Sequence, residues 1–495
     1  MIDRQSEQSE LRRLLQRGTP QLALIYGRRR VGKTFLLTNT WPPEITFYFT
    51  AAATTPDQNR RQLIEDVARW SGQAMVPDDY PNWRTVFRML LDLRAPQPLV
   101  VVLDEFQYLG ETQTALEAVT SELNAAWEQR RESRPLVLVL AGSSVRTLEA
   151  LDAGSAPLHG RFSWKARLEA FDYCHAAEMA RFRSLRDRAY LYGIFGGTPR
   201  FLAAVDPGES LADNAARLML DPRGEVRALV ETALMQEQGL REVPRYTAIL
   251  RAIGSGSTEL NEIGQAAGLQ GDTGLRQKVE RLVGLGYVQQ RRNLGARPKE
   301  PYRYRLGDPA LMFYHAFVAP LGTTLERTPA RRVWRDEVVP RMDTYMGHVF
   351  ERMAEQAYRR RAERLPIVRE WGFWEGLDSE RKALEMDIAC QLTDGRVMTG
   401  GVKWNSRPLT PEWHLHHLKM LDRLAASGVK WAHIARERSS PIIWVAAGGF
   451  SAAFADAVRA SRDEVILWSL KDLYPSAQKP KAASRNGGAR EVLKS

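Results

Sequence analysis

Short apolar runs alternate with amphipathic stretches between Gln21 and Leu202. Each run is rich in aliphatic residues, and each intervening stretch places its apolar residues three or four positions apart. This alternation is typical of an open parallel sheet with helices between its strands. The predicted strands are 22–26, 45–51, 99–103, 136–141 and 166–171, and the predicted helices are 57–70, 83–93 and 115–130. The pattern predicts an α/β domain.

The pattern changes twice further along the chain. Between Asp213 and Ala319 it predicts compact helices at 246–253, 260–267 and 275–284, and then two strands joined by a basic loop in YVQQRRNLGARPKEPYRYRL. That order is typical of a winged helix-turn-helix. The part from Arg341 to Tyr474 predicts a second α/β unit. Its elements are a helix at 346–364, the strands WGFWEG, LEMDIACQL and RVMTGGVKW, a helix at 411–426, the strand PIIWVAA, a helix at 452–460 and the strand EVILWSL.

Composition narrows the class of protein. A chain of 495 residues exceeds what one hydrophobic core usually holds, and its two cysteines, Cys174 and Cys390, form no disulfide framework or zinc-binding spacing. The charged start MIDRQSEQSE and the lack of a run long enough to cross a bilayer predict a cytoplasmic protein with no membrane partner. The net charge of +11 suits a nucleic-acid partner without establishing one.

The segment GRRRVGKT fits the phosphate-loop pattern G-x-x-x-x-G-K-[ST] and directly follows the apolar run LALIY. In this pattern the loop amides surround phosphates, Lys33 reaches the β- and γ-phosphates, and the Thr34 hydroxyl serves Mg²⁺. ATP and Mg²⁺ are therefore the predicted cofactors. The predicted ATP-binding residues are Gly27, Arg28, Arg29, Arg30, Val31, Gly32, Lys33, Thr34 and, at the end of a later strand, Ser143.

Two adjacent carboxylates end the buried run LVVVLDEFQYL. They predict that Asp104 binds the Mg²⁺ and that Glu105 orients or deprotonates the attacking water. Arg161, in LHGRF, is a candidate for stabilising the transition state as a third catalytic residue beside Lys33 and Glu105. The alternatives are a solvated acidic loop, a helix cap at Ser143 and a surface arginine at Arg161.

These motifs together resemble a family. MIDRQSEQSEL, YGRRRVGKT, LDEFQYL, LAGSS, LHGR and FGGTPRFL resemble a prokaryotic family of AAA+/STAND-related P-loop ATPases, called archaeal-type ATPases. The C-terminal part is similar to a domain of unknown function with a PD-(D/E)XK nuclease-like core. The resemblance implies an ATPase domain at 1–205, a helical lid or linker at 206–240, a winged helix at 241–325, a degenerate restriction-endonuclease-like α/β domain at 335–475 and a disordered basic tail at 476–495. It leaves open a homo-oligomer in which Arg161 acts on a neighbouring copy.

The winged helix carries two interpretations. As a DNA reader it would place 275–284 in a major groove, with Arg276, Lys278 and Arg281 near DNA and Arg291 and Arg292 on the wing. Alternatively, the module only packs against the ATPase domain and transmits its nucleotide state.

The nuclease-like resemblance maps onto Glu351, Asp387 and Lys403. A glycine, Gly401, stands where the family typically has a metal-binding acid, and Glu385 compensates at most in part, so we expect DNA cleavage to be absent. The histidines of the sequence WHLHH, His414, His416 and His417, lack acidic or cysteine partners, and we interpret them as a solvated helix face.

Three functional hypotheses follow. The first is an ATPase that couples its nucleotide state to the winged helix and to a nuclease-like, DNA-contacting module. The second is an ATP-regulated, metal-dependent DNA nuclease, and the third is a non-catalytic DNA-binding regulator that uses ATP only as a switch.

Overall fold

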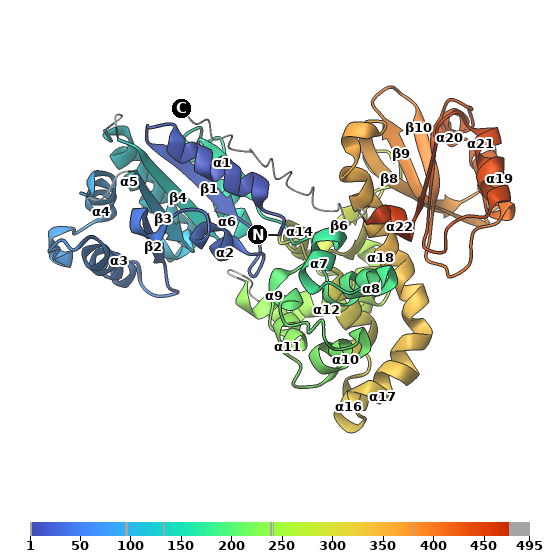
Figure 1. Ribbon diagram of the computed structural model, residues 1–495, viewed down its shortest axis with the longest axis horizontal. Helices are drawn as coiled ribbons and strands as arrows, with labels where there is room; N and C mark the ends of the chain where they lie inside the picture. The colour runs from blue at the N-terminus through green and yellow to red at the C-terminus, as the bar shows by residue number, and fades with distance from the viewer. Residues whose placement is uncertain are drawn as a thin grey trace, which may run out of the picture.

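The computed structural model describes residues 2–94, 98–131, 134–237, 240, 242–378 and 380–474. It forms three lobes (Figure 1). The N-terminal lobe runs from α1 (Gln5–Gln16) to β5 (Trp164–Arg167). The central lobe runs from α7 (Tyr173–Ala180) to α17 (Ala330–Val333), and the C-terminal lobe from α18 (Val339–Arg359) to α22 (Leu470–Leu473). The predicted tail at 476–495 lies outside the described residues.

A five-stranded parallel sheet forms the centre of the N-terminal lobe, in the order β2-β3-β4-β1-β5. Its strands are β1 (Gln21–Tyr26), β2 (Thr46–Thr50), β3 (Leu99–Asp104), β4 (Leu136–Gly142) and β5 (Trp164–Arg167). The inner strands β1, β3 and β4 are buried almost throughout, as expected for a parallel sheet covered on both faces. This is the predicted P-loop NTPase sheet.

The last strand of this sheet differs in extent from the prediction of 166–171. It begins at Trp164 and ends at Arg167. Beyond it the Leu168 amide still donates to Tyr26 O, but the Phe171 amide donates to Gly197 O of the central lobe. The apolar residues after Arg167 therefore belong to the segment that links the N-terminal and central lobes and not to the sheet.

Helices cover both faces of the sheet. One face carries α1 (Gln5–Gln16) and α2 (Lys33–Thr38), and the other carries α3 (Pro56–Ser71), α4 (Trp83–Asp92), α5 (Gln113–Glu128) and α6 (Val145–Ala150). The starts of α3, α4 and α5 are fixed by the side chains of Thr55, Asn82 and Thr112, which accept hydrogen bonds from amides of the first turn. The three helices predicted in this lobe are confirmed within a few residues.

The central lobe is mostly helical. It contains α7 (Tyr173–Ala180), α8 (Leu185–Phe195), α9 (Pro199–Leu202), α10 (Leu211–Ala215), α11 (Glu225–Glu231), α12 (Val243–Gly254), α13 (Leu260–Ala266) and α14 (Leu275–Gly284). The antiparallel pair β6 (Val288–Arg291) and β7 (Arg303–Leu306) follows, and then α15 (Pro309–Phe313), α16 (Gly322–Arg327) and α17 (Ala330–Val333). Three helices and a hairpin thus occupy the predicted positions.

The C-terminal lobe has a mixed sheet in the order β12-β11-β10-β9-β8, with parallel pairing from β10 to β12 and antiparallel pairing from β8 to β10. Its elements are α18 (Val339–Arg359), β8 (Val368–Leu377), β9 (Ala383–Leu392), β10 (Val397–Lys403), α19 (Pro411–Ala426), α20 (Lys430–Ala435), β11 (Ile442–Ala446), α21 (Ala452–Ser461), β12 (Val465–Ser469) and α22 (Leu470–Leu473). The helix predicted from 346 begins earlier: α18 starts at Val339 and directly continues the helical residues 330–338, and Pro340 is tolerated in its first turn.

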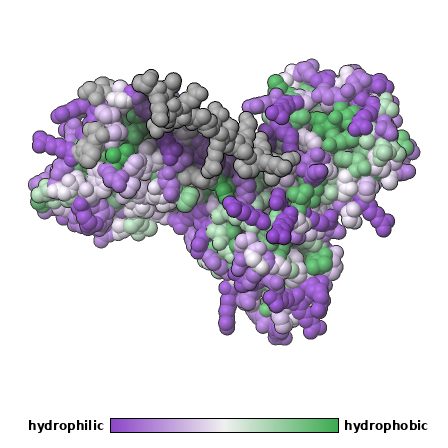
Figure 2. Space-filling model, in the orientation of Figure 1, coloured by the Kyte–Doolittle hydropathy of each residue, from purple (hydrophilic) through white to green (hydrophobic). Residues whose placement is uncertain are grey.

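The hydrophobic cores divide the molecule unequally. One cluster extends from Phe171 to Tyr474, through both the central and the C-terminal lobes. The two faces of the N-terminal sheet have clusters of their own. Apolar side chains gather on the visible face of the C-terminal lobe, whereas that of the N-terminal lobe is more hydrophilic (Figure 2). The hydrophobic core of the N-terminal lobe is therefore separate from the one that the other two lobes share.

Candidate functional site

The loop after β1 has a backbone that requires its glycines. Gly32 has a φ of 95° in the left-handed region, directly before α2. A Cβ at Gly27 would lie 2.3 Å from the carbonyl oxygen of Leu168. The two glycines that the motif predicts are therefore needed for the shape of this loop.

Lys33 lies inside the curve of the loop. Its Nζ donates hydrogen bonds to the carbonyl oxygens of Gly27, at 2.7 Å, and of Arg28, at 3.0 Å. The side chain is buried, and burial lowers the pKa of its ammonium group. A buried cation held only by neutral carbonyls is well suited to bind an anion.

The carboxylates predicted for metal and water lie beside the loop, at the end of β3. Asp104 Oδ2 accepts hydrogen bonds from the Thr34 hydroxyl, at 3.1 Å, and from the Tyr48 hydroxyl, at 2.6 Å. A hydroxyl and a carboxylate oxygen are ligands that Mg²⁺ accepts while it keeps several waters. Thr34 and Asp104 therefore fit a magnesium site.

Glu105 lies next to Asp104 in an unusual conformation, with a φ of 52°. The Ser143 hydroxyl donates to Glu105 Oε2 at 2.7 Å, and the Gln107 side-chain amide donates to the same oxygen. Ser143 also accepts from Gln107 Nε2 at 3.3 Å. The three side chains form one cluster that fixes the direction of the Glu105 carboxylate.

A cavity of about 870 Å³ adjoins these residues, a volume typical of small-ligand pockets. On one side it is lined by the phosphate loop and Glu105. Apolar and basic side chains from the chain start and the central lobe line the rest: Ile2, Arg4, Phe171, Met179, Pro199, Arg200 and Ala203. A cavity with a phosphate loop at one end and apolar walls elsewhere matches the two parts of a nucleotide.

Several residues of this site were not found from the sequence. Tyr48, Gln107, Arg4 and Arg200 come from four separate segments that only the fold brings together. Gln107 alone carried a signal, because it stands two residues after Glu105 in the strand-end motif. Arg29 was predicted, and its Nη2 donates to the Tyr108 hydroxyl at 2.7 Å.

Arg161 does not lie in the cavity of its own chain. Its guanidinium forms an ion pair with Glu128, at 2.6 Å, at the end of α5. Two residues later the Ser163 amide donates to Leu22 O, at the start of β1. This is the amino end of the strand, whereas the phosphate loop follows its carboxyl end. A role for Arg161 within the same chain would need it to cross the sheet; action on a neighbouring copy stays a prediction.

The residues predicted to contact DNA differ in their exposure and in their contacts within the chain. Arg276 is exposed on α14, whereas Lys278 Nζ contacts Asp272 Oδ2 at 3.1 Å. Arg281 is partly buried on the same helix. Arg292 lies 3.9 Å from the ring centroid of Tyr302 and donates to Pro298 O. These contacts leave Arg276 as the most open of the predicted DNA contacts on the helix.

Arg291 points toward the C-terminal lobe and not toward solvent. Its guanidinium lies 3.9 Å from the ring centroid of Phe373, and its Nη1 lies 3.6 Å from Glu351 Oε2. The wing position predicted for DNA is therefore occupied by a contact within the chain.

The nuclease-like residues are close together but paired with cations. Lys403 Nζ lies 2.7 Å from Asp387 Oδ2, and the Val402 amide donates to the same oxygen at 2.7 Å. Glu351 faces Arg291 and Arg305, and burial raises the pKa of its carboxyl group. A Cβ at Gly401 would lie 2.6 Å from the Trp444 ring, so an acid there would force a shift.

Among the described residues, no three His, Cys, Asp or Glu side chains are grouped closely enough to hold a metal ion. Glu351, Glu385 and Asp387 instead line a cavity of about 550 Å³ together with Arg291, Arg305 and Arg352. These residues do not fit a metal centre in this conformation.

The solvated face predicted for the histidines of α19 is wrong for two of them. His414 and His417 are buried, and the His417 ring packs against Trp444. His417 Nε2 lies 3.0 Å from the Thr399 hydroxyl, and His414 Nε2 lies 2.8 Å from the Ser461 hydroxyl. The sheet covers His417 and α21 covers His414, on the face that the sequence pattern assigned to solvent.

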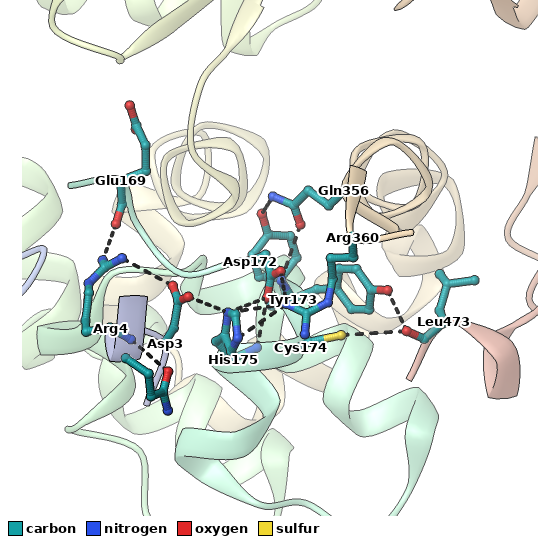
Figure 3. Close-up of polar contacts among 12 residues, drawn as sticks. Asp3, Arg4, Glu169, Asp172, Tyr173, Cys174, His175, Gln356, Arg360 and Leu473 are labelled. Atoms are coloured by element: carbon teal, nitrogen blue, oxygen red, sulfur yellow. Dashed lines mark hydrogen bonds and ion pairs between the residues drawn. The ribbon is translucent and has the colours of Figure 1, made fainter. Parts of the chain in front are cut away.

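A charged junction joins the chain start to the other two lobes (Figure 3). His175 Nδ1 lies 3.3 Å from Asp3 Oδ1 and 3.1 Å from Asp172 Oδ1, and Arg360 Nη1 donates to Asp172 Oδ2 at 2.5 Å. The neighbouring Arg4 donates to Glu169 O at 2.5 Å. The junction thus connects the rim of the nucleotide-sized cavity with α7 and α18.

Comparison with known proteins agrees with this architecture. Residues 1–205 match a family described as an ATPase domain predominantly from Archaea, and residues 314–413 match one described as Archaea bacterial proteins of unknown function. The chain therefore carries an archaeal-type ATPase domain with a P-loop NTPase fold, followed by the domain of the second family. Nothing in the second match specifies a nuclease.

Individual relatives are distant. An uncharacterized protein of Methanocaldococcus jannaschii is 22% identical over 360 residues, which cover 72% of this chain and 76% of the relative. A Walker-type ATPase of Pyrococcus abyssi is 20% identical with a TM-score of 0.46, covering 64% of this chain and 96% of that chain. The Aeropyrum pernix ORC2 protein, in ADPNP–ADP complexes, is 16% identical with a TM-score of 0.43, covering 68% and 95%.

In the part of the chain that the structure describes, no helix is long and apolar enough to cross a membrane.

Proposed function

We propose that this protein is a Mg²⁺-dependent ATPase that transmits its nucleotide state to the winged-helix module and the C-terminal domain. ATP is the substrate, and Mg²⁺ neutralises charge on its phosphates. Lys33 and the loop amides bind the phosphates, Thr34 and Asp104 hold the metal, and Glu105 orients the attacking water. The apolar walls of the cavity take the base.

One observation carries the proposal. Lys33, Thr34, Asp104 and Glu105 come from two segments some seventy positions apart, yet they meet at the carboxyl edge of one parallel sheet. This edge is where ligands bind in open α/β sheets. Neither Asp104 nor Glu105 is paired with an arginine among their described hydrogen bonds and ion pairs, so both carboxylates remain available for a metal and a water.

The arginines of the phosphate loop support the coupling. Arg28 lies over the ring of Tyr287, 4.0 Å from its centroid, and Arg30 donates to Leu229 O at 3.1 Å and to Gln236 Oε1 at 2.7 Å. All three partners belong to the central lobe. A change in the loop on binding nucleotide would therefore reach the lid and the winged-helix module directly.

The test is ATP hydrolysis by the purified full-length chain with Mg²⁺. We expect Lys33→Ala to abolish both hydrolysis and tight nucleotide binding, because it removes the buried ammonium that lies inside the curve of the phosphate loop. Glu105→Gln should abolish hydrolysis while it keeps ATP bound. A wild-type chain that binds no ATP would refute the proposal, and tight binding without turnover would favour the ATP-dependent switch.

DNA as a partner, a cytoplasmic location, self-assembly and the predicted domain boundaries stay predictions. Exposed Arg276 on α14 is the feature that supports DNA contact. The paired state of Glu351 and Asp387 gives no support to a nuclease.

A further inference from the structure

We infer that the β6–β7 hairpin couples the phosphate loop to the C-terminal lobe. We further infer that the acidic cleft of this lobe, which Glu351, Glu385 and Asp387 line, is a docking site for the hairpin and not a metal centre. This inference rests on the proposed nucleotide site. The two ends of the hairpin carry the argument, and α14 and β6 lie between the N- and C-terminal lobes (Figure 1).

One end of the hairpin is held by a single residue of the phosphate loop. Tyr287 directly precedes β6, and Asp308 stands two residues after β7. The Arg28 guanidinium lies 4.0 Å from the Tyr287 ring centroid, and its Nη1 lies 4.0 Å from Asp308 Oδ2. Arg28 therefore contacts the entry and the exit of the hairpin at once.

Carboxylates of the C-terminal lobe contact the two strands of the hairpin. Arg291 ends β6 and Arg305 belongs to β7, and both face Glu351 Oε2, at 3.6 Å and 3.9 Å. Arg305 Nη2 also lies 3.5 Å from Glu355 Oε2. In β7, Arg303 forms an ion pair with Glu375 of β8.

Backbone contacts join the loop after β6 to the edge strand β8. The Leu294 amide donates to Phe373 O at 2.9 Å, and Asn293 exchanges hydrogen bonds with the backbone of Glu375 at 2.8 Å and 3.0 Å. Leu294 is buried in the core beneath α19. A sheet edge is a natural template for such a contact. The C-terminal lobe thus meets the hairpin and its loop through both charged side chains and backbone hydrogen bonds.

Lys33 connects this arrangement to nucleotide binding. In this structure its Nζ donates to Gly27 O and Arg28 O. With phosphates bound, the Lys33 ammonium would turn toward them and away from these carbonyls. The carbonyl of Arg28, directly beside the hairpin, would then lose its hydrogen bond from Lys33. Because coupling free energies are reciprocal, loosening the far end of the hairpin must then change the affinity for nucleotide.

The first experiment measures the Kd of a fluorescent ATP analogue with Mg²⁺ for the full-length chain. Replacing both docking arginines, Arg291→Gln and Arg305→Gln, should lower the Kd about five-fold or more, since the contact holds the arrangement in which Lys33 faces its own loop. Glu351→Gln, from the other side of the contact, should shift the Kd in the same direction. Arg292→Gln is the matched control, because Arg292 contacts Tyr302 and the hairpin loop, and it should leave the Kd unchanged.

Hydrogen exchange checks that the contact itself has opened. The double variant should exchange faster than wild type at 368–377, while exchange in β10 and β11 stays slow. An unchanged exchange rate at 368–377 in the double variant would overturn the coupling. So would faster exchange there combined with a Kd for the nucleotide equal to that of wild type. A wild-type chain that binds no nucleotide would overturn the proposed function, and the coupling with it.

Metal titration tests the docking site against a masked metal centre. In an Asp104→Asn background, which removes the carboxylate of the phosphate site, the double arginine variant should bind no Mn²⁺ tightly. Tight Mn²⁺ binding that a further Asp387→Asn removes would show that the hairpin hides a metal site, contrary to the inference.

Discussion

The phosphate site and the acidic cleft each bring together a lysine and carboxylates, but in opposite states. Lys33 donates only to backbone carbonyls, while Asp104 accepts from neutral hydroxyls. In the cleft, Lys403 is paired with Asp387, and Glu351 faces two arginines. The charged groups of the phosphate site are therefore available for a ligand, whereas those of the acidic cleft are already paired within the chain. Similar residue types are thus open to a ligand in one lobe and paired within the chain in the other.

The largest expected difference between the two sites concerns their aspartates. Asp104→Asn should lower kcat/KM for ATP with Mg²⁺ about 100-fold, because it removes the only carboxylate predicted to hold the metal. The matched change Asp387→Asn should leave this value near wild type. Steady-state hydrolysis over a range of Mg²⁺ concentrations measures both. An Asp387→Asn chain as impaired as Asp104→Asn would mean that the two regions do not differ as described.

A second comparison concerns the residues that position Glu105. Gln107→Ala should lower kcat about tenfold with little change in nucleotide affinity, because the Glu105 carboxylate loses the Gln107 amide and keeps only the hydroxyl and backbone amide of Ser143 as donors. Gln391→Ala, at the edge of β9 with hydrogen bonds to Gly395 O and Arg396 O, is the control and should have wild-type turnover. Loss of nucleotide binding in Gln107→Ala would instead assign this residue to the shape of the site.

The two regions should also respond differently to acid. Burial lowers the pKa of His414 to about 4 and of His417 to about 3. Below about pH 6.5 the unfolded chain binds protons that the folded lobe does not, so each group should remove about 2 kcal/mol of unfolding free energy by pH 5. Hydrogen exchange of β11 at pH 7 and pH 5 measures the loss. His417→Gln, which keeps a polar contact to Thr399, should reduce the pH dependence; an unchanged dependence would exclude His417 as its source.

The smallest effect is expected at the junction in Figure 3. Burial opposes the charged form of His175, but Asp172 and Asp3 outweigh it and raise its pKa. Burial likewise works to raise the pKa of Asp172, yet hydrogen bonds from His175 and the charge of Arg360 lower it to about 2. The pair therefore stabilises the fold between about pH 4 and 6.5, and the contribution is lost as the pH rises through the folded pKa of His175 or falls through that of Asp172.

The measurement at this junction is the free energy of unfolding of wild type and His175→Asn. Their difference should be about 1 kcal/mol at pH 6 and should shrink toward pH 8.5. A difference that stays constant over this range would mean that His175 contributes by packing alone.

The residues predicted for the phosphate site could be grouped from the sequence because they lie within two short segments. Gly27, Lys33 and Thr34 are fixed by a local loop, and a buried strand carries Asp104 to the same sheet edge. Tyr48 could not be found in this way, because its contact with Asp104 depends on the pairing of β2 with β3. The order of elements in the other lobes was likewise predictable from hydrophobic spacing.

The remaining features depend on contacts between segments that are far apart in the sequence. The spacing in α19 does not say which face meets the sheet, so the buried pair His414 and His417 was predicted as solvated. Arg291 looked like a DNA contact because nothing in its own segment indicates that Glu351, sixty positions later, faces it. Arg161 was placed by a motif alone, and its ion pair with Glu128 lies at the other edge of the sheet.

The most direct test compares one lysine from each site in a single assay. ATP hydrolysis by the full-length chain with Mg²⁺ should fall below detection in Lys33→Ala and should remain near wild type in Lys403→Ala. Hydrolysis that survives Lys33→Ala, or that disappears in a folded Lys403→Ala chain, would contradict the assignment of ATPase chemistry to the phosphate site alone.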